Sequence, residues 1–176
     1  MYKLIIFDAD GTLCDRYTGE LLPGVFDKLG ETQMSKVAIA TNQGGVGLRH
    51  WMESAGFGEP ERYPTEAEVR SKYFAVATQV EAARMVYMDD VLVYFAFAYQ
   101  SKISGKWAFV PEGCEYRLAW SHSWRKPNPG MLISAMEDVG VAANDTLFVG
   151  DSDEDRQAAE AAGCDFMEAE EFFSWE

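Results

Sequence analysis

The chain has 176 residues, 48% of them apolar and 14% aromatic, and 29 acidic residues against 15 basic ones give a net charge of −14. This length and apolar content predict one globular domain over residues 1–176 and exclude a disordered chain. The acidic balance argues against a general nucleic-acid or anionic-membrane binder. We expect a monomer or a small homo-oligomer.

Three cysteines, Cys14, Cys114 and Cys164, are odd in number and widely spaced. This usage indicates reduced thiols in a cytoplasmic protein. The first residues turn acidic too soon for a signal peptide. The longest apolar stretch, residues 91–99, is far shorter than the ~20 residues that a helix needs to span a bilayer. We therefore expect no membrane partner.

The first quarter of the chain predicts a strand, a helix and a second strand. Apolar runs at residues 3–8 and 36–41 are typical of strands buried on both faces of a parallel sheet. Pro23 and Gly24 open a helix between them. The expected apolar side of this helix comprises Val25, Phe26 and Leu29.

Residues 42–64 carry five glycines, so we expect a long, flap-like loop there. Trp51 and Phe57 would either stack on a substrate or anchor the loop to its own core. A helix then begins at residues 64–66. Its predicted core stripe comprises Val69, Tyr73, Val76, Val80 and Ala83.

The rest of the chain continues the alternation of strands and helices. Strands are predicted at residues 91–98, 146–149 and 164–167, the last at a sheet edge, and helices begin at Pro129 and Ser152. This order predicts an open, mostly parallel α/β sheet. An insertion from about residue 100 to 125 is expected to hold short extended pieces at 107–110 and 116–120, and Asp89 and Asp90 are expected to form a turn.

Polar residues gather where the predicted strands end. Ligands of open α/β sheets bind beyond the carboxyl ends of the strands. We therefore expect these polar residues to converge on one site. They are Asp8 and Asp10 after the first strand, Thr41 and Asn42 at the end of the second, Asp151 after the strand at 146–149, and Arg125 and Lys126 before the Pro129 helix.

Asp8 and Asp10 lie close enough to repel each other unless a cation relieves the repulsion. Residues i and i+2 of a strand point to the same side, so both carboxylates can face one site. Asp8 and Asp151 could share Mg²⁺, which takes oxygen ligands and completes its shell with water and phosphate. One carboxylate could attack phosphorus and another serve as general acid, while Thr41 and Lys126 hold phosphoryl oxygens.

These stretches resemble the four motifs of the haloacid dehalogenase (HAD) superfamily of phosphohydrolases. DxDGT matches residues 8–12, a strand ending in threonine matches Thr41, the lysine motif matches Lys126, and GDxxxD matches residues 150–155. The motifs occur in the family's order and span most of the chain. The resemblance implies a three-layer Rossmann-like HAD fold, Mg²⁺ as cofactor and phosphate-ester hydrolysis through an aspartyl-phosphate.

The resemblance also implies individual roles. Asp8 would be the nucleophile and a Mg²⁺ ligand, and Asp10 the general acid and base with its main-chain carbonyl on the metal. Asp151 would be a further metal ligand, and Asp155 would brace the site. The expected phosphate or substrate contacts are Thr41, Asn42, Arg125 and Lys126.

Residues 41–45 (TNQGG) and 125–131 (RKPNPGM) resemble one branch, subfamily III, whose members have no large cap. It contains histidinol-phosphate and heptose-bisphosphate phosphatases and the 3′-phosphatase of polynucleotide kinase. The sugar-phosphate enzymes often carry a zinc loop, but this chain offers only Cys114 and His122 there, so we expect no structural zinc. We expect a small phosphorylated metabolite as substrate. The alternatives are a 3′-phosphatase acting on polynucleotide ends and a HAD-like binding protein without catalysis.

Several residues also have a purely structural interpretation. Ser152 and Asp155 have the spacing of a capping box, so Asp155 could cap a helix, brace the site or do both. Asp153 and Glu154 are expected to be solvated acids in the first helical turn. Cys14 is expected to be a bystander near the site. His122 is expected to be a packed or exposed loop residue, with a contact to substrate as the alternative.

Overall fold

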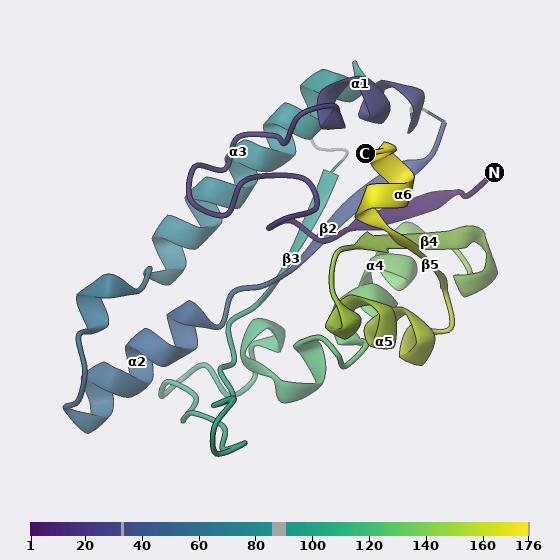
Figure 1. The fold of residues 1–176 in the computed structure, drawn as a ribbon. Helices are drawn as coiled ribbons and strands as arrows, with labels where there is room; N and C mark the ends of the chain where they lie inside the picture. Colours follow the sequence, from purple (N-terminus) through teal and green to yellow (C-terminus); the bar gives the residue numbers. More distant parts are fainter. Residues whose placement is uncertain (33, 86–90, 176) are drawn as a thin grey trace.

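The computed structural model describes residues 1–32, 34–85 and 91–175 and contains a five-stranded sheet (Figure 1). The strands lie in the order β3-β2-β1-β4-β5, and all neighbouring pairs in this sheet are parallel. The predicted α/β fold is therefore confirmed. The strands are β1 Leu4–Phe7, β2 Lys36–Asn42, β3 Val91–Ala96, β4 Thr146–Gly150 and β5 Asp165–Glu168.

Helices cover both faces of the sheet. Leu4 and Ile6 of β1 point into one core with α4 and α5, whereas Ile5 and Phe7 point into the other core with α1, α3 and α6. Burial on both faces explains why β1 is a continuous apolar run. The helices are α1 Val25–Leu29, α2 Gly45–Ala55, α3 Glu66–Arg84, α4 Gly130–Val139, α5 Asp153–Ala162 and α6 Ala169–Phe173.

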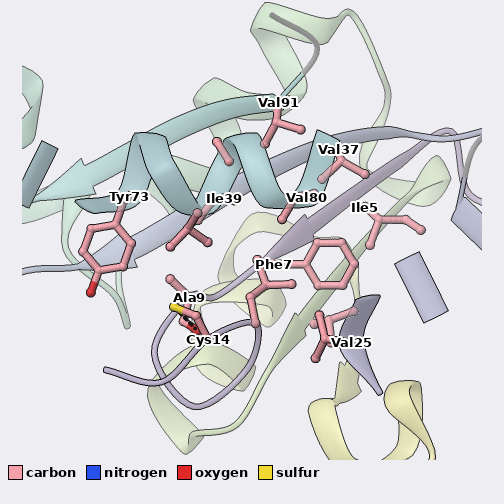
Figure 2. Packing of buried hydrophobic residues seen from close by; sticks show 14 of the residues in the cluster. Ile5, Phe7, Ala9, Cys14, Val25, Val37, Ile39, Tyr73, Val80 and Val91 are labelled. Atoms are coloured by element: carbon pink, nitrogen blue, oxygen red, sulfur yellow. Dashed lines mark hydrogen bonds between the residues drawn. The ribbon is translucent and has the colours of Figure 1, made fainter. Parts of the chain in front are cut away.

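The core stripe predicted for α3 is confirmed. Figure 2 shows Tyr73 and Val80 of α3 near Ile39 of β2. A fully buried valine or isoleucine contributes about 1.5–3 kcal/mol, so this stripe fixes α3 against the sheet. All five predicted positions are buried, namely Val69, Tyr73, Val76, Val80 and Ala83.

The prediction for α1 was wrong at Phe26, whose side chain is 55% exposed. The helix has only five residues, and its buried face is set by Val25 and Leu29, four positions apart. Phe26 follows Val25 directly and therefore lies to one side of that face.

Residues 42–64 are not the long loop that their glycines predicted, because residues 45–55 form α2. Gly47 is needed here for a close approach. A Cβ at this position would lie 2.3 Å from the carbonyl oxygen of Phe97, just beyond the end of β3. The glycine thus lets α2 pack directly on the chain beyond β3. Gly47 is therefore explained by close helix packing and not by a turn.

The insertion, which the structure describes completely, contains no strand. Trp107 makes only an isolated bridge to Gln100, and residues 118–120 and 122–124 form short 3₁₀ turns. The predicted extended pieces are therefore wrong. Main-chain hydrogen bonds from Ser101 to Lys106 and from Ala108 to Tyr99, each 2.9 Å, fold residues 99–108 into a tight hairpin. We call this segment the 99–108 hairpin.

Two further predictions concern the remaining segments. The strand predicted at 164–167 is present as β5, one residue later, at the edge of the sheet. The turn predicted at Asp89 and Asp90 lies outside the described residues. Among the described helices, none has both the length and the apolar character that crossing a membrane requires.

Candidate functional site

The carboxyl ends of β1, β2 and β4 surround one cavity of about 310 Å³, which we call the site cavity. Each strand brings polar residues to this edge, as the sequence predicted. Arg16, Lys102 and Glu154, which sequence analysis did not place at the site, also line the cavity. The predicted residues that line it are Asp8, Asp10, Thr41, Asn42, Arg125, Lys126, Asp151 and Asp155.

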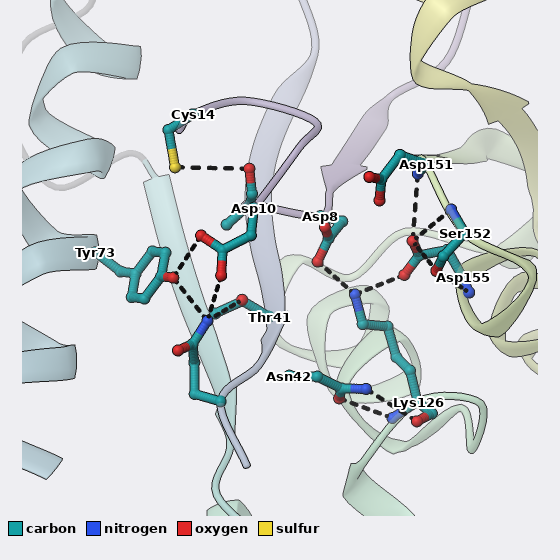
Figure 3. Close-up of polar contacts among 12 residues, drawn as sticks. Asp8, Asp10, Cys14, Thr41, Asn42, Tyr73, Lys126, Asp151, Ser152 and Asp155 are labelled. Atoms are coloured by element: carbon teal, nitrogen blue, oxygen red, sulfur yellow. Dashed lines mark hydrogen bonds and ion pairs between the residues drawn. The ribbon is translucent and has the colours of Figure 1, made fainter. Parts of the chain in front are cut away.

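Lys126 lies at the centre of an acidic cluster (Figure 3). Its ammonium nitrogen is 2.6 Å from Asp8 Oδ1 and 2.6 Å from Asp155 Oδ1. Asp8, Asp151 and Asp155 each place a carboxylate oxygen within 4.8 Å of the others. Three carboxylates against one ammonium leave an excess of two negative charges when all are ionised.

Burial and this excess charge perturb the cluster. The pKa of Asp8 is raised, and burial is the main cause. The charge of Lys126 lowers this pKa, but burial together with the negative charges of Asp155 and Asp151 outweighs that effect. Burial also raises the pKa of Asp151, with a further contribution from Asp155. Burial alone would lower the pKa of Lys126, but Asp8 and Asp155 reverse this and raise it.

A hard divalent cation fits this set of donors. Mg²⁺ prefers carboxylate and carbonyl oxygens and is often held by one or two carboxylates. Such a cation would compensate the two uncompensated negative charges and favour the ionised form of Asp8. The predicted metal ligands were Asp8, Asp10 and Asp151, whereas the carboxylates that lie together are those of Asp8, Asp151 and Asp155. Asp10 was expected to bind the metal through its main-chain carbonyl, so its side chain is not needed in this cluster.

The turn after β1 brings the cluster together. Leu13 and Cys14 both donate main-chain hydrogen bonds to the carbonyl of Ala9, at 2.9 and 3.0 Å. Gly11 adopts a φ of 86°, and a Cβ there would lie 2.4 Å from Asp151 Oδ2. The glycine of DxDGT is thus required both by its left-handed backbone and by the closeness of Asp151.

Asp10 points away from the acidic cluster (Figure 3), although Asp8 and Asp10 line the same site cavity, as expected. The Tyr73 hydroxyl donates to Asp10 Oδ1 at 2.6 Å, and Gln43 Nε2 donates to Asp10 Oδ2 at 3.0 Å. Lys72 Nζ lies 3.6 Å from Asp10 Oδ1. Because the chain turns at Ala9, the alternation of an extended strand does not continue to Asp10.

Sequence analysis missed these partners of Asp10. Tyr73 was assigned only to the α3 core, although a buried tyrosine usually needs a partner for its hydroxyl. Gln43 directly follows Thr41 and Asn42, two predicted site residues, and this position in the sequence could have indicated that Gln43 also lies at the site. Gln43 Nε2 lies within hydrogen-bonding distance of Asp10, Thr41 and the Tyr73 oxygen, so it links the ends of β1 and β2 to α3.

Asn42 clamps the main chain of Lys126. Its Nδ2 donates to the Lys126 carbonyl at 2.9 Å, and its Oδ1 accepts from the Lys126 amide at 3.0 Å. This engagement favours a role in placing Lys126. Arg125 is half-buried, and its Nη1 donates to the carbonyl of Ala98 at 3.3 Å.

Asp155 has both structural roles that the sequence left open. Its Oδ2 accepts from the Ser152 hydroxyl and amide in a capping box at the start of α5, while its Oδ1 contacts Lys126. Glu154, expected to be a solvated acid, is half-buried and lines the site cavity.

Three other residues considered in the sequence analysis have packing roles. Cys14 is buried, and burial raises the pKa of its thiol to about 12. His122 stacks on Trp107 with ring centres 3.8 Å apart. Trp51 packs on Phe57, as the alternative interpretation of that segment expected.

Comparisons with known proteins agree with this geometry. A family model described as HAD-hydrolase-like matches residues 123–167, which contain Lys126, Asp151 and Asp155. Phosphoglycolate phosphatase of Rhodospirillum rubrum is 28% identical over 93% of this chain and 77% of its own length. Phosphoglycolate phosphatase of Escherichia coli K12 is 52% identical, but only over 23% of this chain and 16% of that protein.

Two crystal structures share the fold. A HAD-like phosphatase from Mesorhizobium loti has a TM-score of 0.55 and 25% identity, covering 93% of this chain and 69% of that one. The D,D-heptose 1.7-bisphosphate phosphatase from B. bronchiseptica, complexed with magnesium and phosphate, has a TM-score of 0.56 and 24% identity, covering 93% and 78%. The ordered motifs, the matched segment and the shared fold make this chain similar to the hydrolases of the HAD superfamily.

Proposed function

We propose that this chain is a Mg²⁺-dependent phosphomonoester hydrolase that forms an aspartyl-phosphate on Asp8. The observation that carries the proposal is the convergence of Asp8, Lys126 and Asp151 in one cavity with Asp10 at its side. The named activities of relatives, on phosphoglycolate and on heptose bisphosphate, support a small phosphorylated metabolite as the substrate.

In the first step, a carboxylate oxygen of Asp8 attacks phosphorus and the bond from phosphorus to the alcohol oxygen breaks. Asp10 gives its proton to the leaving alcohol. In the second step, Asp10 takes a proton from water, whose oxygen attacks the same phosphorus and releases phosphate from Asp8. Asp10 regains its proton in this way, and both carboxyl groups return to their starting states.

The other residues would stabilise charge. Lys126, held by Asp155 and Asn42, would neutralise negative charge on Asp8 and on the phosphoryl oxygens. The hydroxyl of Thr41 at the end of β2 would contact a phosphoryl oxygen. Asp8, Asp151 and the main-chain carbonyl of Asp10 would hold Mg²⁺, which supplies further stabilisation of the transferring group when bound.

The experiment is a panel of phosphate esters assayed with Mg²⁺ or with EDTA, on the wild type and on Asp8→Asn. Phosphate release should need Mg²⁺ and should fall to background in Asp8→Asn, because an amide is a poor nucleophile. Asp153→Asn is the matched control, since this exposed acid lies outside the cluster. Full activity in Asp8→Asn would falsify the mechanism.

We further propose a single cytoplasmic HAD domain of the capless subfamily III type, without structural zinc. The net charge of −14 disfavours a long nucleic-acid footprint, so a 3′-phosphatase remains the second choice. Hydrolysis of a 3′-phosphorylated oligonucleotide, with no activity on small esters, would reverse this order. Partner binding without any turnover would instead favour the other alternative, a HAD-like binding protein without catalysis.

A further inference from the structure

Four cations stand out because they form no ion pair in the described part of the chain. They are Arg16, Lys102, Lys106 and Arg125, in a protein with almost twice as many acidic as basic residues. Three of the four, all except Lys106, line the site cavity. Cations without an ion pair therefore lie beside the acidic cluster, where a ligand would bind.

A second cavity of about 310 Å³ adjoins the site cavity, and we call it the outer cavity. It lies between the 99–108 hairpin and residues 125–128 and shares Lys102, Arg125, Lys126 and Glu154 with the site cavity. Glu154 is the one acid in its lining, against three cations. Even with Lys126 engaged by Asp8 and Asp155, two cations face one carboxylate.

The wall of the outer cavity is held in place. The Trp107 ring lies almost parallel to His122, with an angle of 10° and ring centres 3.8 Å apart. The His122 carbonyl in turn accepts from Asn128 Nδ2 at 3.0 Å. These contacts join the hairpin, with Lys102 near its tip, to the segment that carries Arg125.

We propose that the outer cavity binds a second anionic group, a carboxylate or a phosphate, on the alcohol part of the substrate, through Lys102 and Arg125. The proposal rests on the proposed phosphatase function and narrows its substrate class. In the proposed mechanism Lys126 and Asp8 contact the phosphate that is transferred, so the leaving alcohol would extend into the outer cavity. There the guanidinium of Arg125 has five N–H donors, and a single hydrogen bond to a described atom occupies one of them.

The test uses two matched substrate pairs with Mg²⁺ present. In the first, 3-phosphoglycerate carries a carboxylate where glycerol 3-phosphate carries a neutral group. In the second, fructose 1,6-bisphosphate carries a phosphate that fructose 6-phosphate lacks. We expect kcat/KM to be at least about tenfold higher for the anionic member of one or both pairs, as charge-assisted hydrogen bonds are lost without it. The preferred pair identifies the anion.

Lys102→Gln should reduce this preference about tenfold, mainly through KM, and should leave the melting temperature unchanged because the side chain is exposed. Lys106→Gln is the matched control, since it removes an unpaired cation from the same hairpin but outside both cavities. Equal kcat/KM within both pairs, or an unchanged preference in Lys102→Gln, would overturn the subsite while leaving the phosphatase intact. Mg²⁺-dependent turnover of no ester at all would instead reject the proposed function.

Discussion

The hydroxyl of Tyr73 holds the carboxylate of Asp10 at 2.6 Å, from a helix far along the chain. Phenylalanine would keep the buried ring but remove this hydrogen bond to a carboxylate, which is worth about 1.5 kcal/mol or more. Because we propose that Asp10 is the general acid and base, we expect Tyr73→Phe to lower kcat about tenfold with little change in KM. Steady-state kinetics on the best ester of the panel measures this.

Tyr94→Phe is the matched control for this variant. Tyr94 also donates its hydroxyl to a carboxylate, that of Asp138 at 2.7 Å, but neither residue lines the site cavity. This variant should keep the wild-type kcat. Equal losses in both variants would show that Tyr73 acts on the fold and does not position Asp10.

The three cysteines should differ in reactivity. Burial raises the pKa of Cys14 to about 12 and that of Cys164 to about 11, so little thiolate forms on either at pH 8. Cys114 is half-exposed. We expect a thiol reagent such as Ellman's reagent to modify one cysteine quickly in the native protein and all three after unfolding. Cys114→Ser should abolish the fast phase; a fast phase that persists would contradict this placement.

At the scale of elements, the packing of α2 depends on Gly47. Alanine would place its Cβ 2.3 Å from the Phe97 carbonyl oxygen, so the helix would have to shift. Such overpacking typically costs about 1–3 kcal/mol. At about 2–4 °C per kcal/mol for a domain of this size, Gly47→Ala should melt several degrees lower. Gly30→Ala is the control, since its nearest neighbour lies at 3.6 Å and its φ of −57° suits alanine.

The same glycines explain why α2 could not be predicted. Gly44, Gly45 and Gly47 are typical of a loop, and only the close approach of Phe97 to Gly47 shows why Gly47 lies in a helix. The strands were easier because burial on both faces makes them continuous apolar runs.

The chain has capping boxes at the start of α5 and of α3, and variants of the two can be compared to distinguish helix capping from catalysis. Ser152 and Asp155 begin α5 at the site, while Thr65 and Glu68 begin α3 with the same set of hydrogen bonds. Ser152→Ala and Thr65→Ala should each cost about 1 kcal/mol of stability. Only Ser152→Ala should also lower kcat, because it removes the 2.6 Å hydrogen bond that orients Asp155 toward Lys126. Equal kcat in the two variants would limit Asp155 to capping.

At the scale of the whole molecule, the sequence predicted the groups that lie at strand ends or in the RKP stretch of residues 125–127, but not those that other packed segments bring to the site. Asp8, Thr41 and Asp151 follow from strand order, because parallel strands end at one edge of the sheet. The contact between Tyr73 and Asp10 joins positions 63 residues apart and depends on how α3 packs. Lys102 lies at the cavity because main-chain hydrogen bonds fold residues 99–108 into a hairpin, and the sequence of this segment has no periodic pattern that would predict it.

The net charge of −14 and the acidic cluster together predict how cations affect stability. Added NaCl should stabilise the protein modestly by screening general repulsion. Mg²⁺ at about ten times its dissociation constant should add about 1.4 kcal/mol beyond NaCl of equal ionic strength, or about 3–6 °C in melting temperature. Asp151→Asn should lose the Mg²⁺-specific part because it replaces a carboxylate that we propose as a metal ligand by a neutral amide. Asp153→Asn removes the same charge two residues away and should keep that part; differential scanning fluorimetry distinguishes the two, and equal responses would place the metal elsewhere.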